Sequence, residues 1–199
     1  MSLPEILERV TLEGHRARLT PLDLADIPAL WAAQDPGTWT WTLAQPKTLA
    51  DFTHLVQTAL DLSAAGKERA WTTWYDGVVV GSTRFLNASE WDRRVEIGWT
   101  WLGAAVRGTQ VNTAVKLQQL THAFEDRGCV RVELKTDGRN VRSQRAMEKL
   151  GCTYEGRFRK HRRTWSGELF DTAWYSIIDT EWPGVKARLI ERLDGGARG

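Results

Sequence analysis

The middle of the chain alternates between strands and helices, and this pattern restricts the fold more than any other feature. The spacing of apolar residues predicts a strand over 95–102, a loop of small residues over 103–110 and a helix that continues to Arg127. A further strand is predicted over 131–136. Strands joined through a helix are typical of parallel neighbours within one sheet.

Antiparallel hairpins are predicted on both sides of this central unit. Asp76-Gly77 is a strong two-residue turn signal between two apolar runs, and Ser166-Gly167 marks a second turn. The other elements are predicted at 15–20 (strand), 23–31 and 48–66 (helices), 70–75 and 78–86 (strands), 140–150 (helix), 152–159 and 171–178 (strands) and from Pro183 onward (helix). We therefore expect an α/β (mixed α+β) fold with a twisted, mostly antiparallel sheet and helices on both faces.

Chain length, hydropathy and cysteine spacing limit the class of protein that we expect. The 199 residues suffice for one domain, which we expect to span 1–199 with a disordered tail at 195–199. No apolar run approaches the roughly 20 residues of a membrane span, and the N-terminus lacks the pattern of a secretory signal. Cys129 and Cys152 have no metal-site spacing, so we expect buried reduced thiols, no metal and a cytoplasmic location.

The loop before the central helix has the features of an anion site. Arg107 and Gly108 precede a helix N-terminus, which offers unpaired N–H groups and a partial positive charge. Gly108 would let the backbone approach a phosphate closely, and Arg107 would add a charge. A plain connection between a strand and a helix is the alternative interpretation. Neither of the usual glycine-rich nucleotide motifs occurs, which argues against a kinase, an ATPase or a nicotinamide dehydrogenase.

A second feature supports the anion site. Asn140 begins a predicted helix that ends at Leu150-Gly151, eleven positions later. Together with the loop, this helix resembles the corresponding parts of the GNAT acyltransferase superfamily. The chain is most similar to its ribosomal-protein alanine N-acetyltransferase branch, through Glu96-Ile97-Gly98-Trp99, Arg107-Gly108-Thr109, Val111-Asn112, Arg131-Val132-Glu133-Leu134, Asn140 with Ser143, Leu150-Gly151 and Glu155-Gly156.

The resemblance implies an N-acetyltransferase that moves an acetyl group from acetyl-CoA to a primary amine by direct attack in a ternary complex. In that family the strand at 95–102 diverges from the strand at 131–136, and the pantetheine arm of CoA lies between them. Backbone groups of Thr100, Trp101 and Leu102 would pair with the arm and polarise the thioester. The other cofactor-binding residues that the resemblance implies are Arg107, Gly108, Thr109, Val111 and Asn112 for the pyrophosphate, and Asn140 and Ser143 for the arm.

Three positions depart from the family pattern. Ala105 and Gln110 replace the usual residues of the family's phosphate loop, and Gln110 raises the prospect of a narrowed or re-shaped loop. Met147 stands where many members have the tyrosine that protonates the departing thiolate, and a thioether has no proton to give. A CoA-binding member without catalysis is therefore an alternative.

Two catalytic roles have candidate residues. Ser143 lies one helical turn after Asn140 and is our candidate to protonate the thiolate, although it could instead only share the helix cap. Glu96 is our candidate for the general base, directly or through water, with an ion pair to Arg84, Arg93 or Arg94 as the alternative; Glu155 is a second candidate.

The acceptor is not identified by these patterns. A protein N-terminus, such as that of a ribosomal protein, and a small-molecule amine both remain open. Trp39 and Trp41 are expected to form an aromatic wall for the acceptor, if the loop is extended and both indoles point the same way; packing on the sheet or on a second subunit of a homodimer is the alternative. The basic run 157–163 beside Trp165 suggests weak contact with nucleic acid or merely a solvated hairpin, and no membrane partner is expected.

Overall fold

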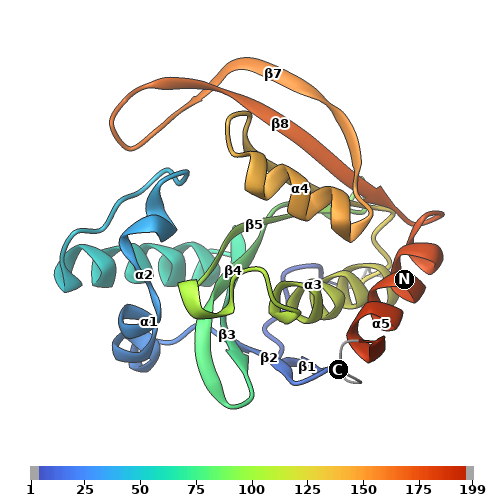
Figure 1. Cartoon of the computed structure of the whole chain (residues 1–199), viewed down its shortest axis with the longest axis horizontal. Helices are drawn as coiled ribbons and strands as arrows, with labels where there is room; N and C mark the ends of the chain where they lie inside the picture. The colour runs from blue at the N-terminus through green and yellow to red at the C-terminus, as the bar shows by residue number, and fades with distance from the viewer. Residues whose placement is uncertain (1–4, 196–199) are drawn as a thin grey trace.

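The computed structural model describes residues 5–195, which form one open sheet flanked by helices (Figure 1). The strands are β1 (Leu12–Gly14), β2 (Ala17–Pro21), β3 (Glu68–Tyr75), β4 (Val78–Ser89), β5 (Arg94–Leu102), β6 (Arg131–Asp137), β7 (Thr153–Arg163) and β8 (Leu169–Ile178). The α-helices are α1 (Ile27–Ala33), α2 (Leu49–Ala64), α3 (Val111–Thr121), α4 (Val141–Leu150) and α5 (Trp182–Gly195). Gly195 is thus helical, and the remainder of the tail predicted to be disordered, 196–199, lies outside the described residues.

The sheet is mixed and mostly antiparallel, as predicted. Its eight strands follow the order β1-β2-β3-β4-β5-β6-β8-β7 among the described residues. The β5–β6 pair is parallel, and every other neighbouring pair is antiparallel. The strand predicted at 15–20 corresponds to β2, whereas the short β1 was not predicted because three residues give too little periodicity to detect.

Helices cover both faces of the sheet. On β4 the neighbours Val79 and Val80 belong to different apolar clusters, as Ala70 and Trp71 do on β3, and successive side chains of a strand point to opposite faces. One cluster contains residues of α3, α4 and α5, and the other contains residues of α1 and α2. The prediction of helices on both faces is therefore confirmed.

Local signals in the sequence set the ends of several elements. Thr48 and Asp51 form a reciprocal capping box at the start of α2. Asp76 and Gly77 have φ values of 50° and 76°, as a two-residue hairpin turn requires. Gly151 ends α4 with a φ of 95°, in the left-handed region that glycine adopts without a steric penalty.

The opening in the sheet between β5 and β6 is the feature that positions the site. These two strands pair only over Arg94–Glu96 and Arg131–Glu133, and beyond that point they diverge. Opposite β4, β5 also contains a bulge, where Trp99 has a φ of 49°. The edge of β5 after Glu96 therefore faces an open space instead of a neighbouring strand.

Two further expectations concern membranes and metals. No helix within residues 5–195 is long and apolar enough to cross a membrane. In the same part of the chain, no three His, Cys, Asp or Glu side chains come together as a metal site would need. Cys129 and Cys152 are buried free thiols, as expected.

Candidate functional site

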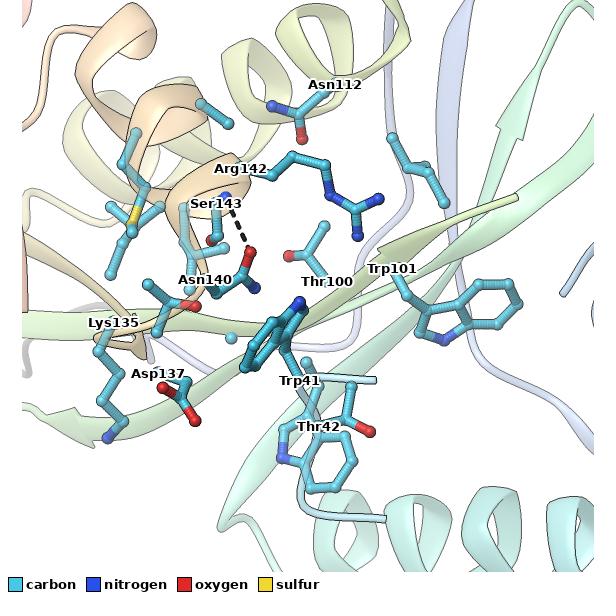
Figure 2. Close-up of a pocket in the computed structure, with 18 of the residues that line it drawn as sticks. Trp41, Thr42, Thr100, Trp101, Asn112, Lys135, Asp137, Asn140, Arg142 and Ser143 are labelled. Carbon is cyan, nitrogen blue, oxygen red and sulfur yellow. Dashed lines mark hydrogen bonds between the residues drawn. The ribbon is translucent and has the colours of Figure 1, made fainter. Parts of the chain in front are cut away.

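A cavity of about 710 Å³ lies where β5 and β6 diverge. Its walls are the end of β5, the loop before α3, the first turns of α3 and α4, and residues that follow α1 (Figure 2). The predicted site residues that line it are Glu96, Thr100, Trp101, Leu102, Arg107, Gly108, Thr109, Asn112, Asn140 and Ser143. Val111 is not among the lining residues, because its side chain is buried in the core.

The backbone of β5 provides one wall of the cavity. Trp101 and Leu102 pair with β4 on one edge of the strand, so their other edge faces the opening. The Leu102 carbonyl already accepts a hydrogen bond from Arg107 Nε at 2.8 Å. Backbone groups at Thr100 and Trp101 are therefore better placed than the Leu102 carbonyl to pair with an extended ligand.

The loop before α3 has the geometry of an anion site. Gly108 has a φ of 78°, and a Cβ built on it would meet no atom within 4 Å, so the space before it is open. Within the loop, the Arg107 N–H donates to the Ala104 carbonyl, and the Val111 N–H donates to Thr109 Oγ1. Among the described residues, the N–H groups of Gly108, Thr109, Gln110 and Asn112 have no such acceptor, and Gly108, Thr109 and Asn112 also line the cavity.

The side chain of Arg107 does not point a free positive charge at the anion site, as the sequence suggested. It turns toward the segment after α1, where it pairs with the Asp35 carboxylate and donates to Thr38 Oγ1 at 2.6 Å. Burial alone would raise the pKa of Asp35, but the hydrogen bonds from Arg107 and Thr38 outweigh it and hold that pKa below its usual value. Arg107 therefore ties the loop before α3 to the segment after α1, through its ion pair with Asp35.

Gln110 also points away from the cavity. Its side-chain amide donates to the carbonyls of Arg192 and Leu193, at 2.8 and 3.4 Å, and so caps the end of α5. Arg192 in turn donates to the Lys149 carbonyl at 2.7 Å and lines the cavity. The expectation that Gln110 narrows the loop is therefore not met, and α5 contributes a cation to the cavity that no local motif indicated.

The first turn of α4 provides the opposite wall. Asn140 Oδ1 accepts a hydrogen bond from the Ser143 N–H at 3.1 Å, which confirms Asn140 as the N-cap (Figure 2). The cap uses the backbone of Ser143, and this residue also lines the cavity. Arg142, which sequence reasoning missed, is the next residue along the chain and also lines the cavity, and in the same view its guanidinium extends toward the side of Thr100 and Trp101.

Glu96 is buried at the point where the strands diverge. Its Oε2 accepts hydrogen bonds from Lys135 Nζ at 2.6 Å and from Asn87 Nδ2 at 2.7 Å. The ion-pair partner is thus Lys135 and not one of the three predicted arginines. Oε1 lies over Gly98, where a Cβ would come within 3.2 Å of it.

The three arginines that were predicted as partners of Glu96 have other contacts. Arg84 forms a buried ion pair with Glu68 at 2.7 Å and lies over the Trp99 ring. Arg94 lies within 4.0 Å of Asp92 and Glu133, and Arg93 donates to backbone carbonyls after α3.

Glu155 is not brought to the cavity. Arg131 donates to both oxygens of this carboxylate, at 2.5 and 2.6 Å, and Ser176 donates to it as well. The hydrogen bonds from Arg131, followed by that from Ser176, hold the pKa of Glu155 below its usual value despite partial burial. The Arg131–Glu155 pair is therefore a structural ion pair, and its carboxylate is a poor proton acceptor.

The two loop tryptophans occupy different environments. A 3₁₀ turn over Pro36–Trp39 points Trp39 into the core, where it is 2% exposed and contacts Phe52 and Trp101. Trp41 is 38% exposed, lines the cavity and lies under the Arg139 guanidinium. Both residues border the cavity. The expectation that the two indoles point the same way is wrong, because the loop is helical rather than extended and packs Trp39 into the core.

Lys116 is a further group in the cavity wall that sequence reasoning missed. Its side chain is 3% exposed, and its Nζ donates to hydroxyl and amide oxygens of Thr83, Thr100 and Gln119. Burial lowers the pKa of Lys116 to about 7. The apolar helix pattern gave no signal for it, since a lysine in such a pattern is usually exposed.

The hairpin of β7 and β8 lies beyond α4 (Figure 1). Most of its basic residues are exposed, as are the aromatic rings of Phe158 and Trp165. Lys47 lies over the Trp165 ring, and Arg139 contacts Glu168 at 2.7 Å, so the hairpin tip approaches the segment that carries Trp41.

Comparison with known proteins matches residues 16–153 to the acetyltransferase (GNAT) domain family. YdaF of Bacillus subtilis (strain 168), provisionally named a ribosomal N-acetyltransferase, is 30% identical over 112 residues, which are 56% of this chain and 60% of YdaF. The match thus spans less than two thirds of that relative. A GCN5-related N-acetyltransferase from Brucella melitensis superimposes with a TM-score of 0.87 at 28% identity, over 94% of this chain and 86% of the other. A structure from T. thermophilus, provisionally described as an acetyltransferase, gives 0.83 at 36% identity, over 92% and 96%.

Proposed function

Since this chain belongs to the GNAT acetyltransferase family, we propose that it transfers the acetyl group of acetyl-CoA to a primary amine. The observation that carries the proposal is the opening between β5 and β6. There a free strand edge, an open glycine loop at the start of α3 and the capped start of α4 line one cavity of about 710 Å³. A long, thin ligand with an anionic end fits such a cavity.

The proposed binding mode assigns a role to each wall. The pantetheine arm pairs with the β5 edge at Thr100 and Trp101 and passes beneath Asn140. The pyrophosphate is bound by the N–H groups of Gly108, Thr109 and Asn112, where the α3 dipole favours negative charge. Arg107 contributes by fixing the loop through its ion pair with Asp35.

The proposed mechanism is direct attack by the amine on the thioester. Holding both substrates in one cavity supplies much of the rate, because the reaction becomes effectively unimolecular. Glu96 takes the proton of the acceptor through a water at Oε1, since Oε2 is occupied by Lys135 and Asn87. Ser143 donates a hydrogen bond to the leaving sulfur from the opposite wall.

The acceptor that we favour is the N-terminal amine of a protein, and a ribosomal protein is the specific class. Support comes from the name of the relative YdaF and from the exposed basic hairpin next to the cavity. Trp41 lines the cavity, and on the proposed acceptor side its indole can contact the apolar part of an acceptor. A small-molecule amine is the rival acceptor, and CoA binding without catalysis is the rival to turnover.

Two measurements test this proposal. Acetyl-CoA binds only the native state, so saturating acetyl-CoA should raise the melting temperature by mass action. A CoA-release assay should then show turnover with N-terminal peptides of ribosomal proteins and little with polyamines or amino acids. An unchanged melting temperature would remove the cofactor assignment, whereas a stabilised protein without turnover on any amine would identify the non-catalytic member.

A further inference from the structure

Lys116 is a buried cation in the cavity wall. Its Nζ donates to Thr100 Oγ1 at 2.7 Å, to Gln119 Oε1 at 2.8 Å and to Thr83 Oγ1 at 3.3 Å. None of the ion pairs found within residues 5–195 includes Lys116. A lysine is almost never buried without a carboxylate partner, so this placement calls for a functional reason.

The groups that contact Lys116 do not fix it in its charged form. Neutral groups face it from β4, β5 and its own helix: Thr83, Thr100 and Gln119. The ionisable group that acts on it is the Cys152 thiol after α4, and burial raises the pKa of that thiol to about 12. Burial lowers the pKa of Lys116 itself to about 7, so both its ammonium form and its neutral amine form are populated near neutral pH.

Lys116 lines the cavity in which the thiolate would leave in the proposed function. It lines the cavity together with Thr100 of β5, beside which the pantetheine arm passes in the proposed function, and with Met147, Leu134 and Leu150. The last three side chains are apolar and cannot solvate a thiolate. A sulfur anion between these walls would be costly unless a cation or a proton is supplied.

We propose that Lys116 gives its proton to the sulfur of CoA as the thioester breaks. The acceptor nitrogen forms the new C–N bond, the C–S bond breaks with its electron pair on sulfur, and the sulfur takes the proton from Nζ. The surplus proton of the acceptor passes to water at Glu96, and the neutral Lys116 is reprotonated from water. Ser143 orients the sulfur through its hydroxyl, while Lys116 supplies the proton. This inference rests on the proposed function.

The test uses CoA itself, so it needs no acceptor. The thiol of bound CoA is titrated between about pH 6 and pH 10 through the ultraviolet absorbance of its thiolate, in the wild type and in Lys116→Met. Methionine matches lysine in length but has no charge, and it suits a buried site. We expect the thiol of CoA to ionise at least about one pH unit lower in the wild type, a tenfold change in its acid dissociation constant. The reason is that a thiolate next to Nζ favours the ammonium form of Lys116, and the two opposite charges then stabilise each other.

The controls separate this inference from its premise. Lys186→Met removes a lysine of α5 that pairs with Glu125, and it should titrate as the wild type. Identical thiolate titrations in the wild type and Lys116→Met, with CoA bound to both, would overturn the inference and leave the proposed function intact. A wild type that binds no CoA would overturn both. If Lys116→Met does not fold, Lys116→Gln is expected to give the same shift, and its absence there is equally decisive.

Discussion

Valine in place of Gly108 tests whether the loop before α3 binds the pyrophosphate. Gly108 has a φ of 78°, a region that a β-branched residue adopts only with strain. Gly77 offers a matched control, because its φ is 76° and a Cβ there also meets nothing within 4 Å. Gly77 lies in the β3–β4 turn and not among the residues that line the cavity.

The two substitutions should destabilise the fold by the same amount. A left-handed backbone costs a non-glycine residue about 1–2 kcal/mol. For a chain of this size, that loss lowers the melting temperature by roughly 2–8 °C. Neither valine meets a protein atom through its Cβ, so strain in the backbone is the main cost at both positions.

Only the substitution at Gly108 should weaken binding of acetyl-CoA. Its side chain would occupy the open space in which the N–H groups of Gly108 and Thr109 meet the pyrophosphate. Hydrogen bonds to a charged group are worth about 1.5–3 kcal/mol each, so losing two costs about 3–6 kcal/mol. That loss corresponds to roughly two to four decades in Kd.

Isothermal calorimetry with acetyl-CoA on the wild type, Gly108→Val and Gly77→Val measures the difference, and thermal melts confirm that all three proteins are folded. Equal affinities of a folded Gly108→Val and the wild type would refute the placement of the pyrophosphate. Equal losses of affinity in both variants would show that backbone strain, and not a lost contact with the pyrophosphate, weakens the binding of acetyl-CoA.

The remaining predictions concern the other walls of the cavity. Ser143→Ala should lower kcat by about tenfold or more and leave the Kd of acetyl-CoA unchanged, because its donor acts on the leaving sulfur; an unchanged kcat would confine Ser143 to the helix cap. Trp41→Ala should raise the KM of the acceptor and leave the melting temperature unchanged. Trp39→Ala should instead lower the free energy of unfolding by about 3–5 kcal/mol, since Trp39 is 2% exposed. A large loss of stability in Trp41→Ala would contradict the role of Trp41 in the acceptor wall. Without ligand, the stability of the wild type relative to Lys116→Met should rise from about pH 7 to pH 10, because the unfolded state then binds a proton that folded Lys116, with its pKa of about 7, has lost; chemical denaturation at several pH values measures this slope, and a flat difference would show that Lys116 stays charged when buried.

The fold was predictable from the sequence because its signals are local. Capping residues such as Thr48 and Asn140, the Asp76-Gly77 turn and Gly151 act within a few residues of their own position. Combined with apolar periodicity, they give the element order and the mixed sheet. The limit of this reasoning is β1, whose three residues are defined by pairing with β2 and not by their own pattern.

The walls of the cavity were predicted more completely than the orientations of the side chains in them. All the predicted site residues except Val111 and the second candidate base Glu155 line the cavity, since the resemblance fixed their places on β5, the loop and α4. The Arg107 guanidinium, however, pairs with Asp35, 72 residues away in sequence. No spacing rule reports such a partner, because an ion pair forms between groups that the fold brings together.

The sequence by itself therefore determined the secondary-structure order, the family and the backbone that lines the site. Only the tertiary structure decided that Gln110 caps a helix 82 residues further on, and that Trp39 is buried while Trp41 is exposed. It also decided that Lys116 is buried with a pKa of about 7. Caps, turns and periodicity depend on contacts between residues close in the chain. Burial and pKa depend on which distant groups surround a side chain, and those neighbours exist only once the sheet and both helical layers are assembled.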